Sequence, residues 1–150
     1  MTKIIYSNSD GTVSVITPTG DVELAKKDVP SGTSYEVVED NIIPTDRYFR
    51  NSWTGNNIGI ATATTTITED ISKARELHKT NIRNARTPKL AALDIEFQKA
   101  QETSAGITTI VANKQALRDA PAASGIATAA NTTELKAQWD TSNLGTSPYS

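Results

Sequence analysis

The sequence predicts an α+β fold, in which a small N-terminal antiparallel β part precedes a C-terminal antiparallel helical hairpin and a short terminal helix. Short β-branched and aromatic runs separated by turn residues fill residues 1–53. From residue 69 onward, apolar residues recur every three or four positions, which is typical of the buried face of a helix. We therefore expect four parts: a β-rich part at 1–53, a Thr-rich connector at 54–68, a helical hairpin at 69–139 and a flexible or extended tail at 140–150.

Three strands are expected in the β-rich part, at residues 3–6, 12–16 and 34–39. The Asp10-Gly11 pair between the first two predicts a hairpin, because glycine adopts positive φ without a steric penalty. Residues 22–27 form a candidate short helix that ends before Pro30. Three short strands make a small sheet of marginal independent stability.

The densest aromatic cluster follows Pro44. Thr45 or Asp46 is a suitable N-cap for a short helix in which Phe49 and Trp53 lie four residues apart on one face. The favoured interpretation is an internal anchor, with Trp53 filling a small core. The alternative is an exposed partner-binding hot spot built from Trp, Tyr and Arg.

The connector at residues 54–68 carries no charged side chain and consists mostly of Thr, Gly and Asn. Its second half has strand propensity, but the alternation of apolar and polar residues is weak. An extended segment is favoured, and a loop remains open.

The helical part begins with Thr68 as a cap, followed by acidic residues in the first turn. Its predicted packing face contains Ile71, Ala74, Leu77, His78, Asn81, Ile82 and Ala85. A basic stripe is expected on the solvent side of the same helix and comprises Arg75, Lys79, Arg83 and Arg86. Pro88 either begins a second helix or kinks a continuous one.

A turn at Gly106 leads to a returning arm, which the pattern carries to Ala120-Pro121. Asn131 and Glu134 resemble a capping box at the start of a short helix that bears Leu135 and Trp139. The tail that follows is rich in Ser and Thr, so we expect it to extend or fray.

The chemical inventory contains no catalytic constellation. There is no cysteine, and the single histidine, His78, lies on the predicted packing face, where a structural role is favoured over that of a base. We therefore predict no enzyme activity, no cofactor and no metal site.

With 15 basic and 17 acidic residues, a dedicated nucleic-acid binder is disfavoured. For the basic stripe, a solvated face or an inter-subunit contact with the acidic N-terminal part is the better interpretation. No run of 18 apolar residues exists, so no membrane contact is predicted.

One phrase carries a family resemblance. Asn41-Ile-Ile-Pro-Thr-Asp-Arg-Tyr-Phe-Arg-Asn-Ser-Trp53 resembles an IPxDRxFRNxW phrase found in small proteins of the tail or virion gene region of tailed bacteriophages and prophages. Residues 73–94, 114–119 and 133–139 resemble later segments of the same proteins, in the same order. The long Thr-rich connector and the Ser/Thr tail depart from the usual pattern.

The resemblance implies a non-enzymatic virion structural protein of the tail, tail-fibre or adaptor region, which is made in the host cytoplasm and incorporated in the virion. Its partners would be other phage virion or tail proteins and further copies of itself, as a homo-oligomer. A phage tail assembly chaperone that is absent from the mature particle is the alternative, and a small nucleic-acid-associated regulatory module is a distant one. The candidate partner-binding residues are Tyr48, Phe49, Trp53, Arg75, Lys79, Arg83, Arg86 and Trp139.

Overall fold

A computed structural model describes residues 1–149 and has the predicted α+β class, with short strands followed by helices. The chain divides into two compact units, of which the first spans Met1–Ala74 and the second begins at Arg75. The predicted connector is therefore no linker between domains. It belongs to the first unit, and the boundary lies inside the long helix α2 (Ile71–Glu102).

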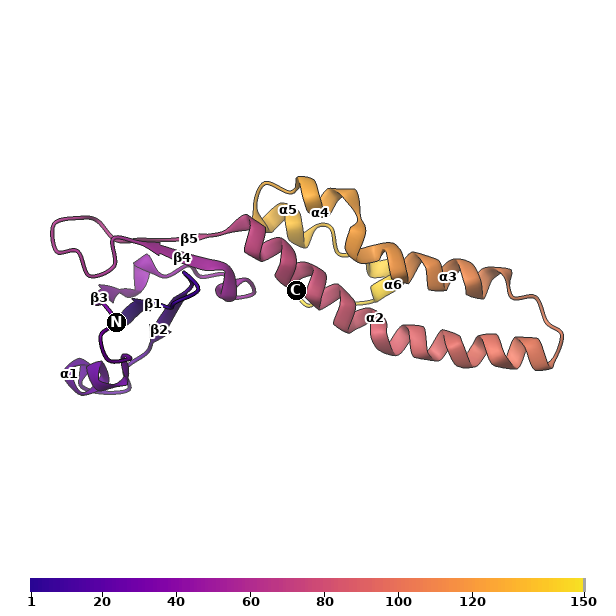
Figure 1. Ribbon diagram of the computed structural model, residues 1–150, viewed down its shortest axis with the longest axis horizontal. Helices are drawn as coiled ribbons and strands as arrows, with labels where there is room; N and C mark the ends of the chain where they lie inside the picture. Colours follow the sequence, from indigo (N-terminus) through magenta and orange to yellow (C-terminus); the bar gives the residue numbers. More distant parts are fainter. Residues whose placement is uncertain (150) are drawn as a thin grey trace. The chain divides into compact units, whose positions relative to one another are not determined.

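The first unit contains a three-stranded antiparallel sheet with the strand order β2-β1-β3 (Figure 1). Its strands are β1 (Thr2–Ser7), β2 (Val13–Ile16) and β3 (Tyr35–Glu39). The β1–β2 hairpin forms at the predicted turn, where Gly11 has φ of +78°. Ile4 and Ile5 are both fully buried, and successive strand residues point to opposite faces, so both faces of the central strand are covered.

A short helix after the second strand confirms the expectation for residues 22–27. Helix α1 (Val22–Ala25) begins at Asp21, whose side chain accepts a hydrogen bond from the Glu23 N–H at 2.8 Å. A 3₁₀ turn (Lys26–Asp28) follows, and Val29 is already extended ahead of Pro30, as expected for a residue before proline.

The predicted aromatic helix at residues 46–53 is wrong. The Asp46 carboxylate accepts the Tyr48 N–H at 3.0 Å, but only a 3₁₀ turn (Arg50–Ser52) follows, and Trp53 opens strand β4 (Trp53–Asn56). Trp53 is 2% exposed and belongs to the core cluster of this unit, with Ile5, Val13, Val38 and Ile43. Strand pairing and burial of the indole at that position outweigh a local helix of two turns.

The connector is partly strand and partly loop. Strand β4 pairs antiparallel with β5 (Thr66–Glu69), and residues 57–65 form the loop between them. The Glu36 carboxylate of β3 accepts hydrogen bonds from the Gly59 N–H and the Thr65 hydroxyl, which ties the loop to the neighbouring sheet. Thr68 is therefore a strand residue, and Asp70 takes the predicted capping role by accepting the N–H groups of Ser72 and Lys73.

The second unit contains the predicted antiparallel helical hairpin (Figure 1). Its arms are α2 and α3 (Thr108–Asp119), and Pro88 lies inside a continuous α2 rather than at the start of another helix. Among residues 83–116 only Ala100 is buried, so the end of the hairpin near the turn has almost no core.

Three short helices complete the second unit: α4 (Ser124–Thr128), α5 (Thr132–Lys136) and α6 (Thr141–Leu144). The predicted capping box is confirmed, since Asn131 accepts the Glu134 N–H at 2.9 Å while Glu134 accepts the Ala130 N–H at 2.7 Å. The core of this unit gathers where these helices lie beside the first half of α2 (Figure 1). It contains His78, Ile82, Leu117, Ile126, Leu135, Trp139 and Leu144.

The expected extended or frayed tail at residues 140–150 is wrong for most of its length, while Ser150 lies outside the described residues. Asp140 caps α6 by accepting the N–H groups of Ser142 and Asn143, and Leu144 is only 4% exposed. The prediction rests on the polar composition of the tail, but two of its side chains, Leu144 and Tyr149, anchor it to the rest of the unit. The ring of Tyr149 stacks on His78 with 5.5 Å between ring centroids.

Candidate functional site: a basic groove in the helical unit

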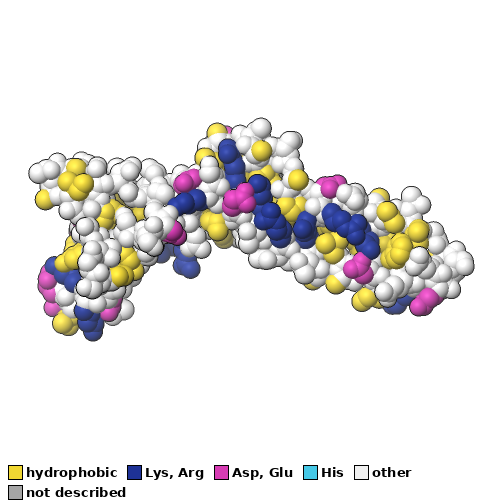
Figure 2. All heavy atoms as spheres, viewed as in Figure 1, with side chains coloured by type: hydrophobic (Ala, Val, Ile, Leu, Met, Phe, Trp, Pro, Cys, Tyr) yellow, Lys and Arg dark blue, Asp and Glu magenta, His cyan; other side chains and the backbone are white. Residues whose placement is uncertain are grey.

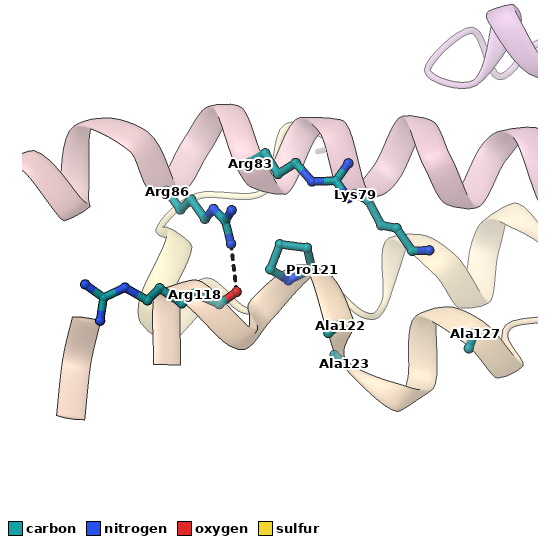
Figure 3. Close-up of a pocket in the computed structure, with 8 residues that line it drawn as sticks. All are labelled: Lys79, Arg83, Arg86, Arg118, Pro121, Ala122, Ala123 and Ala127. Atoms are coloured by element: carbon teal, nitrogen blue, oxygen red, sulfur yellow. Dashed lines mark hydrogen bonds between the residues drawn. The ribbon is translucent and has the colours of Figure 1, made fainter. Parts of the chain in front are cut away.

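The first half of α2 and the segment after α3 enclose a groove of about 380 Å³ (Figure 3). Four cationic side chains and four small apolar residues line it: Lys79, Arg83, Arg86, Arg118, Pro121, Ala122, Ala123 and Ala127. In Figure 3 the four cationic side chains follow one another in the order Arg118, Arg86, Arg83 and Lys79, with the end of Arg118 pointing away from Pro121 and that of Arg83 lying over α2. Lys and Arg atoms also gather over this part of α2 in the space-filling view (Figure 2).

Helical spacing places three of the cations on one side of the groove. Lys79, Arg83 and Arg86 are separated by four and three residues, so they share one face of α2. The expectation of a solvent side is confirmed for Arg83, which is exposed, while Lys79 and Arg86 are half-buried beside the returning segment. Arg75, one turn earlier, donates from Nη2 to the Ala129 carbonyl at 2.8 Å.

Arg86 connects the two sides of the groove. Its Nη1 donates to the Arg118 carbonyl at 2.7 Å and to the Leu117 carbonyl at 3.3 Å. The last carbonyls of a helix have no intrahelical partner, and a cation is favoured near that negative end of the helix dipole. Arg86 therefore holds the end of α3 against α2 and is a structural residue of the groove.

Most of the positive charge in the groove is not neutralised. Lys79 pairs with Glu76 at 2.7 Å, and this hydrogen bond, together with the nearby charges of Lys79 and Arg83, lowers the pKa of Glu76. Within residues 1–149 the guanidinium groups of Arg83 and Arg118 make no hydrogen bond or salt bridge. The groove thus offers two uncommitted guanidinium groups to an anion.

The aromatic candidates are mostly interior. Phe49, Trp53 and Trp139 are 0%, 2% and 8% exposed, so the structure rejects them as exposed partner-binding residues and supports the internal-anchor interpretation of Trp53. The Trp139 Nε1–H donates to the Gly145 carbonyl at 3.0 Å. Tyr48 is 49% exposed and lies in the first unit.

His78 is fully buried, and burial lowers its pKa to about 4. Asn81 donates to the Tyr149 hydroxyl at 3.2 Å, and the same hydroxyl is hydrogen-bonded to His78 Nδ1 at 2.8 Å. The lowered pKa keeps the imidazole neutral at pH 7. Its Nε2 is buried without a hydrogen-bond partner, which suits a packed core residue rather than a base that exchanges protons with a substrate.

Arg118 is the residue that the sequence analysis missed. It lies on the returning arm, about 30 residues from its neighbours on α2, and no periodic pattern joins residues across a turn. Only the return of α3 alongside α2 places its side chain beside the basic stripe.

No family model, curated protein or solved structure matches the chain. Within residues 1–149, none of the helices combines the length and the apolar character that a membrane crossing needs. The described residues also contain no cluster of three or more His, Asp or Glu side chains placed to bind a metal ion.

Proposed function

We propose that this protein is a non-enzymatic structural protein of a bacteriophage virion, in the tail, tail-fibre or adaptor region, and that it acts through protein–protein contacts. The observation that supports a binding role most strongly is the basic groove. Lys79, Arg83, Arg86 and Arg118 line one concave surface, and the exposed Arg83 and Arg118 make no hydrogen bond or salt bridge among the described residues, so both are available to a binding partner.

The assignment to the virion is supported by the phrases at residues 41–53, 73–94, 114–119 and 133–139 that resemble phage tail-region proteins. A tail component requires surfaces for neighbouring subunits and for further copies of itself, and closed rings are the usual outcome of such contacts.

Peptide mass spectrometry of purified, nuclease-treated particles from the source virus tests this proposal. We expect this protein at a fixed ratio to the major tail protein, and that ratio would give its ring symmetry. A protein that is abundant in the infected lysate but missing from particles would contradict the structural role.

A tail assembly chaperone is the second candidate, and exposed apolar side chains on the hairpin favour it. Ile95 on α2 is 54% exposed and Val111 on α3 is 46% exposed, in the region where the hairpin has almost no core. Such a surface suits a client that is released before the particle is complete. Presence in lysate and absence from particles is the expected result for this candidate.

A further inference from the structure

The ligand preference of the basic groove follows first from its charge. Lys79, Arg83, Arg86 and Arg118 line it, and Glu76 is the carboxylate that pairs with one of them. The guanidinium fork matches a carboxylate or phosphate through two parallel hydrogen bonds. The guanidinium groups of Arg83 and Arg118 make no hydrogen bond or salt bridge among the described residues. We therefore expect the occupant to carry at least two separated anionic groups.

The spacing of the cations indicates an elongated occupant. Residues 79 and 83 are one helical turn apart, about 6 Å along the axis at 1.5 Å per residue. Alternate side chains of an extended peptide are spaced by about 6.6 Å on one side of the chain. A peptide strand with acidic residues at alternate positions therefore matches the spacing of Lys79 and Arg83 along α2.

The opposite wall of the groove suits a peptide backbone. It consists of Pro121, Ala122, Ala123 and Ala127, whose small side chains let another main chain approach closely and offer methyl contacts to small apolar side chains. None of the lining residues is aromatic, so the groove has no platform on which nucleic-acid bases could stack.

We propose that the basic groove binds an acidic peptide segment of a partner protein in an extended conformation, with alternate Asp or Glu residues facing Lys79 and Arg83 and a further acidic residue facing Arg118. This inference rests on the proposed function in that the occupant is a protein. It is tested with purified components, so its outcome does not depend on whether the protein is found in virus particles.

Fluorescence anisotropy with labelled ten-residue peptides is the test. The full chain is titrated into a peptide of alternating Glu and Ala, a peptide of the same composition with all Glu residues in one block, and an alternating Gln-Ala peptide. We expect saturable binding of the alternating acidic peptide, at least threefold tighter than the block peptide, and no binding of the Gln-Ala peptide.

Charge-reversal variants locate the binding site. Arg83→Glu and Arg118→Glu are each expected to weaken binding of the alternating acidic peptide at least tenfold. Lys99→Glu makes the same charge change on an exposed part of α2 outside the groove and is expected to change binding less than twofold. Arg83→Gln and Arg118→Gln replace the reversals if circular dichroism shows that either lowers the unfolding temperature, and the same direction of change is expected.

Three results would overturn the proposal. The first is no saturable binding of the alternating acidic peptide at low salt. The second is an equal loss of affinity in Lys99→Glu, which would indicate general charge attraction. The third is tighter binding of a ten-nucleotide single-stranded DNA than of the peptide, with the same loss in Arg83→Glu, which would assign the groove to nucleic acid.

Discussion

At the scale of a single residue, His78 packs in the core of the helical unit, and its burial lowers its pKa. Its ring is stacked on Tyr149 and meets the edge of Trp139, with 6.1 Å between the latter ring centroids. The Lys136 ammonium lies 6.0 Å from the Tyr149 ring centroid, so a positive charge is already near this cluster. Protonating His78 would place a charge in the buried core, and the loss of solvation of that charge explains why its pKa is depressed.

This arrangement predicts a specific pH dependence of stability. The pKa of His78 falls from 6.5 in the unfolded chain to about 4 in the folded chain, so between these values the unfolded state binds more protons. Stability is therefore retained above pH 6.5 and falls as the pH drops toward 4, by up to about 3 kcal/mol. Urea unfolding at pH 7.5 and pH 4.5 measures this loss.

The variant His78→Gln serves as the comparison, because carboxylates also titrate at low pH. The difference in unfolding free energy between the two pH values is expected to shrink by about 2 kcal/mol or more in this variant. An unchanged difference would mean that His78 does not contribute to the pH dependence.

At the scale of an element, the long helix α2 contains an unfavourable residue, Pro88, in its interior. Pro88 lacks the N–H that would bond to the carbonyl of Asn84, and its ring crowds that carbonyl. The Thr87 hydroxyl donates to the Arg83 carbonyl at 2.8 Å, which supports the turn just before the proline. Helix α2 therefore continues across Pro88 without the backbone hydrogen bond from this position.

Pro88→Ala is expected to stabilise the protein by about 1–2 kcal/mol, because an interior helical hydrogen bond is restored and the ring clash is removed at an exposed position. Thermal unfolding followed by circular dichroism measures the effect. Ala92→Gly, one turn further along the exposed side, is the control and should lower stability by about 1 kcal/mol. A lower unfolding temperature for Pro88→Ala would contradict this expectation and show that the proline itself stabilises the fold.

At the scale of the whole molecule, the two units have separate cores. The first is built around Trp53 and the sheet, and the second closes only when the C-terminal segment returns to α2. Leu144 and Tyr149 complete the surroundings of His78 and Trp139. Residues 141–149 are thus part of the fold of the second unit.

Deletion of residues 141–150 is expected to destabilise the second unit by about 3 kcal/mol or more, because it removes a buried leucine, the ring over His78 and the acceptor of the Trp139 Nε1–H. Two-dimensional ¹⁵N–¹H NMR separates the units. Amide signals of β1–β3 should keep their positions while those of α4 and α5 shift or broaden. Unchanged signals from the second unit would contradict this prediction and indicate that the tail does not contribute to the core of that unit.

The sequence by itself determined the features that rest on local pattern. Alternating β-branched residues and Gly11 defined the β1–β2 hairpin, a 3.6-residue period placed Ala74, His78 and Ile82 on the buried face of α2, and Asn131 with Glu134 marked the start of α5. Each of these signals lies within a few residues, where backbone geometry and capping act directly.

Only the tertiary structure decided the features that depend on residues distant in sequence. Trp53 became a strand residue because its partner, Glu69, lies across a loop, and Tyr149 was ordered because the His78 ring and the Asn81 amide meet it. The basic groove likewise required the end of α3, with Arg118, to return beside Arg86 on α2. Burial and long-range pairing outweigh local propensity at such positions, because their free energies come from surfaces that local sequence does not contain.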